Sequence, residues 1–107
     1  MRLLRKEKHF LRKILNEADR YKRQDLLTHA NANQINAVSE MVLNLLKKNI
    51  PVGPNVVKML RPHKHRLRQI GERSSSLKQR RQHLHSQTGE GFWNGLRHVF
   101  KACHCRS

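Results

Sequence analysis

The sequence predicts an all-α fold, specifically a small irregular helical assembly with one apolar central helix and basic helical arms. Two observations lead to this prediction. Apolar residues recur at helical spacing along much of the 107-residue chain. The sequence also lacks the period-two alternation of β-branched and aromatic residues that is typical of strands. A net charge of +16, from 23 Lys and Arg against 7 Asp and Glu, predicts that the helices around the centre are strongly basic.

A central helix is expected within residues 31–50 because the apolar spacing is clearest there, from about residue 33 to residue 48. One face of this helix holds Ile35, Val38, Val42 and Leu45. Asn31 and Gln34 are spaced as a capping box, and Pro51 limits continuation of the helix. This helix is predicted to form the core.

Residues 1–30 are predicted to form a basic amphipathic helix or a pair of helices. The apolar positions at helical spacing are Leu4, Leu11, Ile14, Leu15 and Ala18. Asp19 is suited to cap a second short helix, but no Gly or Pro separates the two halves. The pattern therefore leaves one long helix and two shorter helices equally open.

Residues 51–88 are predicted to form a highly basic helical arm. Pro51, Gly53 and Pro54 indicate a turn, and Pro54 is suited to the first position of a short helix. Pro62 is expected to break or restart this helix. Two helices with few apolar residues are expected to follow, and these residues are Leu67, Ile70, Leu77 and Leu84.

Residues 89–107 are predicted to form an amphipathic aromatic tail. Its apolar residues are Phe92, Trp93, Leu96, Val99 and Phe100, and all but Trp93 follow the i, i+4, i+7, i+8 spacing of one helical face. The interspersed Arg97, His98 and Lys101 make the segment cationic, which is compatible with the surface of an anionic membrane. The alternative is that the tail docks onto the central helix.

The charge is distributed as two basic arms around a nearly neutral middle. Residues 1–28 carry +5, residues 29–56 carry +1, residues 57–85 carry +8 and residues 86–107 carry +2. So large an excess repels itself in a compact chain, which favours a polyanionic partner that neutralises it. The expected partner is nucleic acid, DNA ahead of RNA, and binding is expected to be independent of base sequence because no base-reading motif is present.

The candidate nucleic-acid-binding residues lie mainly in the second arm, with support from the first. Those of the second arm are Lys58, Arg61, Lys64, Arg66, Arg68, Arg73, Lys78, Arg80 and Arg81. Those of the first arm are Arg2, Arg5, Lys6, Lys8, Arg12 and Lys13. The simpler alternative is a solvated helix face without a partner, but very little acid is interleaved to neutralise these cations. The basic clusters are also compatible with a nuclear import signal.

Catalytic, metal and cofactor chemistry is not expected. The seven carboxylates are scattered, and a small chain with few apolar residues offers little to preorganise a pocket. Cys103, His104 and Cys105 offer soft ligands, but C-x-C lacks the usual zinc spacing and has no second ligand pair. Two other classes stay open: a cationic membrane-surface protein, and a helical protein-interaction module that docks through the face formed by residues 35–46.

The expected location is the nucleus or a virion, with neither secretion nor a transmembrane segment. No apolar run of about 18 uncharged residues is present, and the charged first ten residues lack the apolar block of a signal peptide. The two cysteines lie together near the C-terminus, so they are not spaced as a disulfide framework.

From about residue 26 to residue 96, the order of the motifs resembles small basic proteins of Polinton and adintovirus-type elements, which have been likened to the adenovirus core protein mu. The motifs include Asp25-Leu26-Leu27, Gln34-Ile35, Asn44-Leu45-Leu46, Asn49-Ile50-Pro51, Leu67-Arg68, Ser76-Leu77-Lys78, Arg80-Arg81 and Gly91-Phe92. The resemblance implies a virion core or DNA-condensing role carried by the basic residues. The family's tail is a long, almost uncharged apolar block, whereas this tail contains Asn94, Arg97 and Lys101.

Overall fold

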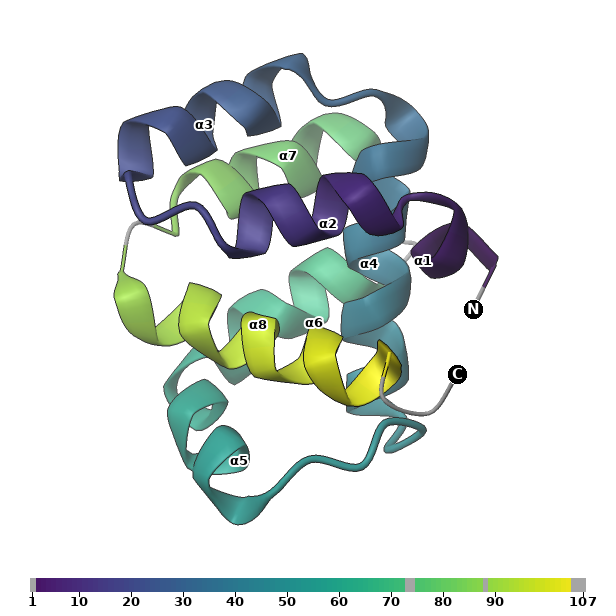
Figure 1. The fold of residues 1–107 in the computed structure, drawn as a ribbon, viewed down its shortest axis with the longest axis vertical. Helices are drawn as coiled ribbons and strands as arrows, with labels where there is room; N and C mark the ends of the chain where they lie inside the picture. The colour runs from purple at the N-terminus through teal and green to yellow at the C-terminus, as the bar shows by residue number, and fades with distance from the viewer. Residues whose placement is uncertain (1, 73–74, 88, 105–107) are drawn as a thin grey trace.

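The all-α prediction is confirmed by a computed structural model that describes residues 2–72, 75–87 and 89–104, in which no strand is present. Figure 1 shows that the helices cross one another in several directions and do not form a parallel bundle. In chain order they are α1 (Arg2–Lys6), α2 (Lys8–Leu15), α3 (Arg20–His29), α4 (Ala32–Leu46), α5 (Pro54–Leu60), the 3-10 turn η1 (Arg61–His63), α6 (Lys64–Gly71), α7 (Leu77–His85) and α8 (Glu90–His104).

Helix α4 is the predicted central helix, and it begins with the predicted capping box. The Asn31 side-chain oxygen accepts a hydrogen bond from the Gln34 backbone N–H, and the Gln34 side-chain oxygen accepts one from the Asn31 N–H, each at 2.9 Å. The two bonds satisfy two donors that the helix itself leaves unpaired. The helix ends at Leu46, just before Lys48 takes a left-handed backbone conformation with a φ of 61°.

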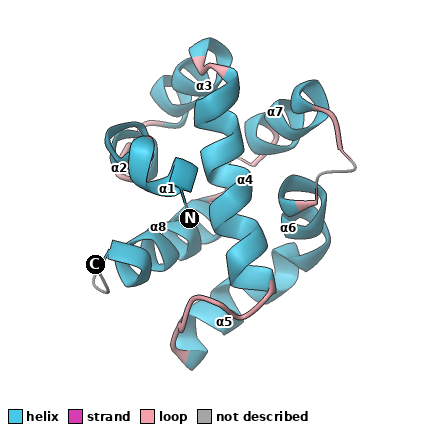
Figure 2. Ribbon diagram, turned by 90° about the vertical axis from the view of Figure 1, so that its right-hand side faces the viewer, coloured by secondary structure: helices cyan, strands magenta, loops and turns pink. Residues whose placement is uncertain are grey.

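The α4 helix is enclosed by other helices on two opposite sides. In Figure 2, α2 and α8 lie on one side of α4 and α6 and α7 on the other. Its buried residues therefore extend beyond one stripe and are Ile35, Ala37, Val38, Ser39, Met41 and Val42. Leu45, predicted to share the buried face, is only half-buried.

The N-terminal segment forms separate helices, so the alternative of one long helix is wrong. The Asp19 carboxylate accepts hydrogen bonds from the backbone N–H groups of Tyr21 and Lys22 at 2.8 and 3.4 Å, which fixes the start of α3. Ala18, expected at helical spacing with the other apolar residues of this segment, lies instead in the connection before this cap and is exposed. The Leu4 backbone N–H donates to the Glu40 carboxylate at 2.7 Å, which attaches α1 to α4.

The basic arms are packed against the core rather than extended from it. A few apolar side chains anchor the thin helices: Leu67 and Ile70 of α6 and Leu84 of α7 are at most 3% exposed. A second capping box, between Ser76 and Gln79, begins α7. The radius of gyration of 12.4 Å is near the ~13 Å of a compact domain of this length.

The aromatic tail forms α8 and belongs to the core. Phe92, Trp93, Leu96, Val99 and Phe100 are all at most 6% exposed. They pack mainly against α5 and α2 and less against α4, so the expected docking onto the central helix is only part of the contact. The closest approach is at Gly95, where a Cβ atom would lie 2.5 Å from Leu60 Cδ2 of α5.

We therefore expect Gly95→Ala to lower the free energy of unfolding by about 1–3 kcal/mol, because buried Leu60 has little room to move away. Gly91→Ala in the same helix is the matched control, since its Cβ would meet only His63 Nε2 at 3.9 Å. The control should be neutral or stabilising by up to about 1 kcal/mol. Urea denaturation of both variants measures the difference, and equal stabilities would contradict the close packing of α8 on α5.

Candidate nucleic-acid interface

Most of the positive charge has no carboxylate to pair with, because the chain has 23 Lys and Arg and only 7 Asp and Glu. Within the residues that the structure describes, and leaving Arg80 aside, no Lys or Arg pairs with a carboxylate. The ion pair that does form joins His29 to Asp25 at 3.4 Å, on the surface. The carboxylates of Asp19 and Glu40 instead accept hydrogen bonds from backbone N–H groups. The exposed Lys and Arg side chains among the described residues are therefore available to a partner outside the molecule.

One basic surface, which we call the α6–α7 surface, consists of exposed Arg61, Lys64, Arg68 and Lys78. The first three lie at i, i+3 and i+7 along η1 and α6, so they occupy successive turns of the same face. Lys78 belongs to α7, which packs beside α6. Such a row can contact several phosphates of one nucleic-acid backbone at once. Lys58 on α5 is exposed as well.

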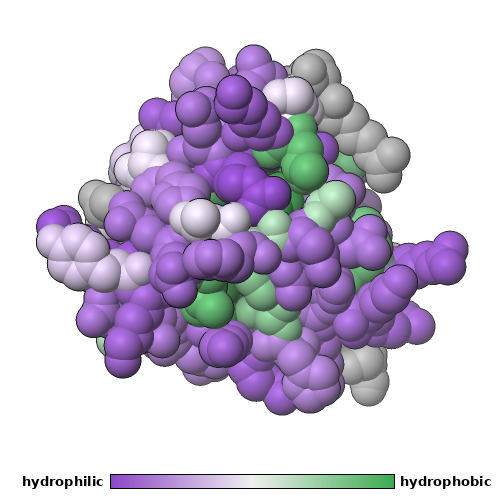
Figure 3. Space-filling view, turned by 90° about the horizontal axis from the view of Figure 1, so that it is seen from above, coloured by the Kyte–Doolittle hydropathy of each residue, from purple (hydrophilic) through white to green (hydrophobic). Residues whose placement is uncertain are grey.

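A second basic surface, the α1–α2 surface, lies on the other side of α4 (Figure 2). Its exposed cations are Arg2, Arg5, Lys6, Arg12 and Lys13. Lys8, predicted with them, is half-buried. The view from above in Figure 3 shows a mostly hydrophilic face with small apolar patches between the polar side chains. The exposed cations of the two surfaces thus belong to helices that lie on opposite sides of α4.

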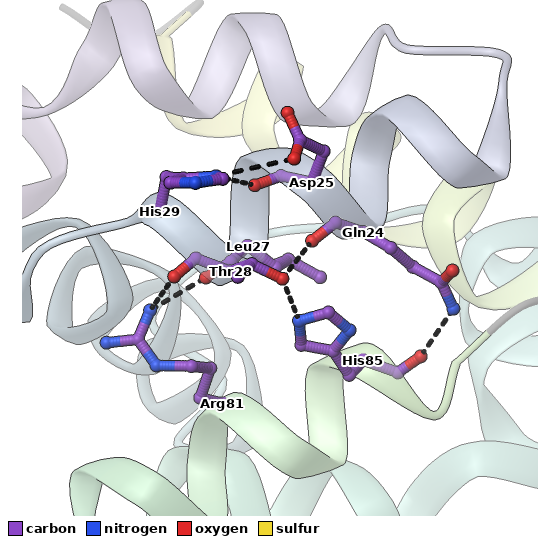
Figure 4. Close-up of polar contacts among 7 residues, drawn as sticks. All are labelled: Gln24, Asp25, Leu27, Thr28, His29, Arg81 and His85. Atoms are coloured by element: carbon purple, nitrogen blue, oxygen red, sulfur yellow. Dashed lines mark hydrogen bonds and ion pairs between the residues drawn. The ribbon is translucent and has the colours of Figure 1, made fainter.

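Three arginines predicted to contact phosphate make hydrogen bonds within the protein instead. Arg81 Nη1 donates to the backbone carbonyls of Leu27 and Ala30 at 2.7 Å each, and to that of Thr28 at 3.4 Å (Figure 4). These carbonyls end α3, so the guanidinium caps that helix from α7. The α3–α7 contact is completed by Thr28 Oγ1, 2.9 Å from His85 Nε2.

Arg80 and Arg66 have similar internal partners. Arg80 Nη1 donates to Asn36 Oδ1 at 2.8 Å and to Ser39 Oγ at 2.9 Å, which joins α7 to α4. Arg66 Nη1 donates to His83 Nδ1 at 2.6 Å, which joins α6 to α7. All of these acceptors are neutral, so the bonds hold the helices together without cancelling the charge. Arg73 lies outside the described residues.

Sequence reasoning missed the buried Arg23. Its side chain is 3% exposed and lies with Cζ 4.8 Å from the centroid of the Trp93 ring. Nε donates to the carbonyl of Ile14 at 3.3 Å, and Nη2 donates to that of Glu17. Burial lowers the pKa of Arg23, while the nearby Glu90 and Glu17 act in the opposite direction. Its i, i+4 spacing from Leu27 was the signal that it lies on the apolar face of α3.

The tail residues predicted for membrane or docking contacts are buried in the core, namely Phe92, Trp93, Leu96, Val99 and Phe100. Trp93 Nε1 also donates to the Gln87 carbonyl at 2.5 Å, which fixes the indole at the start of α8. A membrane role through these side chains would require α8 to leave the core. None of the helices in the described residues combines the length and apolar character that crossing a bilayer requires.

The C-terminal cysteine segment offers no assembled ligand set in the part that is described. Burial raises the pKa of the Cys103 thiol to about 11, so at neutral pH it is protonated and a poor metal ligand. Cys105 and the His104 side chain, the other residues of the C-x-C segment, lie outside the description. Among described residues, no three His, Cys, Asp or Glu side chains gather as a metal site would require.

We expect Arg81→Ala to lower the free energy of unfolding by about 1.5–3 kcal/mol, because the carbonyls at the end of α3 lose a charged donor. The matched control is Lys78→Ala, which removes the same charge from an exposed position on α7. The control should stay within about 0.5 kcal/mol of the parent protein. Chemical denaturation compares the two, and equal effects would show that Arg81 does not cap α3.

The bond between Arg66 and His83 makes stability depend on pH. Burial lowers the pKa of His83, and the nearby positive charges of Arg66 and His65 lower it further. The unfolded chain, with a His pKa of about 6.5, therefore takes up a proton more readily than the folded chain. This contribution to stability is complete above about pH 6.5 and decreases as the pH falls below it.

We therefore expect His83→Gln to lose less stability than the parent protein between about pH 7.5 and pH 5. The Gln side-chain oxygen can still accept from Arg66, but it does not titrate. Urea midpoints at the two pH values give the comparison. The same decrease in both proteins would rule out His83 as a source of the pH dependence.

Comparison of the chain with protein-family models, with curated proteins and with solved structures finds no match. The resemblance to small basic core proteins, which rests on the order of the motifs, therefore stays a prediction. The candidate site is a pair of cationic surfaces on either side of α4, and Arg66 and Arg81 join neighbouring helices through neutral hydrogen-bond acceptors.

Proposed function

We propose that this protein binds nucleic acid, duplex DNA ahead of RNA, without reading its base sequence, and that it helps to condense it. The observation that carries the proposal is the net charge of +16, because 23 Lys and Arg face only 7 Asp and Glu and internal ion pairs could never cancel that excess. A charge of this size in a compact chain is stabilised by an acidic polymer that brings many phosphates close together.

The arrangement of the cations supports binding through the phosphate backbone. Arg61, Lys64 and Arg68 form a row on one helical face, and long flexible cations in a row match repeated phosphates rather than individual base edges. The short helix α6 is anchored to α4 through Leu67 and Ile70, so its cationic face is held in place by the core.

Condensation is supported by the second surface. The α1–α2 surface and the α6–α7 surface lie on opposite sides of α4 (Figure 2), so one molecule has cations for two nucleic-acid segments. Bridging two segments screens their mutual repulsion, which a single binding face does less effectively. This role agrees with the virion core function that the resemblance implies.

The direct test is the salt dependence of binding to a fluorescent duplex, followed by fluorescence anisotropy between about 50 and 200 mM salt. Replacing Arg61, Lys64 and Arg68 together by Gln should flatten the log-log slope by about 0.9 for each phosphate that the variant no longer neutralises. The matched control replaces exposed Arg20, Lys22 and Lys47 by Gln, which removes the same charge outside both surfaces.

The control triple variant should keep a steeper slope than the α6–α7 variant. A parent affinity that does not change over this salt range would overturn the proposal. Condensation is tested separately by energy transfer between two differently labelled duplexes. Replacing Arg5, Arg12 and Lys13 by Gln should reduce energy transfer more strongly than binding of a single duplex.

A further inference from the structure

An open groove that the nucleic-acid proposal does not use lies at one end of α4. It has a volume of about 590 Å³ and is bounded by the end of α4, the connection over residues 47–53, α5 and the start of α6. Its floor is apolar and consists of Leu45, Leu46, Ile50, Val52, Leu60 and Leu67. Val57 lies at its edge and is 44% exposed. A volume of this size suits several inserted side chains.

One side of the groove is formed where α4 ends and the chain turns toward α5. The connection turns away at Lys48, whose φ of 61° is uncommon for a residue other than glycine. Two hydrogen bonds from Asn49 then stabilise the turn. Its backbone N–H donates to the Asn44 carbonyl at 2.9 Å, and its side-chain Nδ2 donates to Asn44 Oδ1 at 3.0 Å. The buried Leu60 of α5 packs toward Gly95 of α8. Leu45 and Leu46 are consequently left half-buried.

The charges around the groove are of one sign. Exposed Lys48, Arg61 and Lys64 line it, and no Asp or Glu is among its lining residues. An occupant must therefore combine an apolar face with negative charge.

We propose that this groove binds an acidic amphipathic helix of a protein partner. An amphipathic helix places its apolar side chains at i, i+3, i+4 and i+7 in such a groove and leaves its other face in water, which suits a groove open on one side. Acidic residues beside the apolar face reach the three cations. The interaction is distinct from nucleic-acid binding because it depends on the apolar floor.

Other occupants fit the groove less well. Nucleobases would find no aromatic ring among its lining residues on which to stack. A second copy of this chain carries +16, so its basic helices would be repelled by the lining cations. A single fatty acyl chain would leave much of its length exposed along the open side, whereas bound ligands are normally buried over most of their surface.

The probe is a fluorescent, end-capped helical peptide with Leu at the i, i+3, i+4 and i+7 positions and Glu elsewhere. A scrambled peptide of identical composition has the same charge but no apolar face. Fluorescence anisotropy at about 150 mM salt, where general charge attraction is screened over about 8 Å, should give binding of the amphipathic peptide at least about tenfold tighter than of the scrambled one.

The variant that tests the groove is Val57→Glu. It places a carboxylate at the groove edge, near the N-terminus of α5, where an acid is compatible with the helix dipole and the position is already exposed. Its matched control is Tyr21→Glu, which adds the same charge at a residue 67% exposed on α3 and absent from the groove lining. Circular dichroism confirms that both variants fold.

Val57→Glu should weaken binding of the amphipathic peptide about tenfold relative to Tyr21→Glu. Because the new carboxylate lies four residues before Arg61 of the α6–α7 surface, binding of duplex DNA is measured as well, and it should differ between the two variants by less than binding of the peptide does. Equal binding of the two peptides, or equal effects of the two variants on peptide binding, would overturn the proposal and leave the nucleic-acid function untouched. Occupation of the groove by laurate, with no binding of the peptide, would also overturn it. Loss of DNA binding by the parent protein would bear on the nucleic-acid proposal alone.

Discussion

The burial of α4 is the constraint from which the other features of this fold follow. Apolar residues extend beyond one stripe of this helix, so a single neighbour cannot cover them, and helices pack on two opposite sides. Apart from α8, which is as long as α4, the covering helices are short and basic, and each contributes a few buried side chains such as Leu11, Ile70 or Leu84. Burying these residues turns the charged faces outward. The core thereby creates two cationic surfaces.

Arginine and lysine take different parts in this arrangement. Arg66, Arg80 and Arg81 use their fork of donors to join one helix to the next through neutral acceptors. Lys64 and Lys78 remain on the outside of the same helices. A guanidinium supports several directed hydrogen bonds at once, whereas an ammonium is a compact and strongly hydrated charge. Arginines thus join the helices, while lysines of the same helices stay exposed.

The α6–α7 surface and the groove at the end of α4 share two residues, Arg61 and Lys64. A phosphate backbone lying along α6 and an acidic helix lying in the groove would therefore meet at the same pair of cations. Of these two partners, only the acidic helix would contact the apolar floor of the groove. A partner protein bound there would be positioned to displace nucleic acid from this surface, which gives the two proposals a physical connection.

Much of the fold was predictable from local pattern, including the helices, the caps at Asn31 and Asp19 and the central position of α4, because spacing and capping act over a few residues. Long-range packing was not predictable in the same way. Nothing near Arg81 in the sequence indicates the α3 carbonyls that it caps, and Arg23 was counted as charge although Trp93 covers it. Local residues therefore determined the helices and the net charge, whereas contacts between distant helices decided which cations are exposed, because hydrogen-bond partners and burial exist only once the helices have packed.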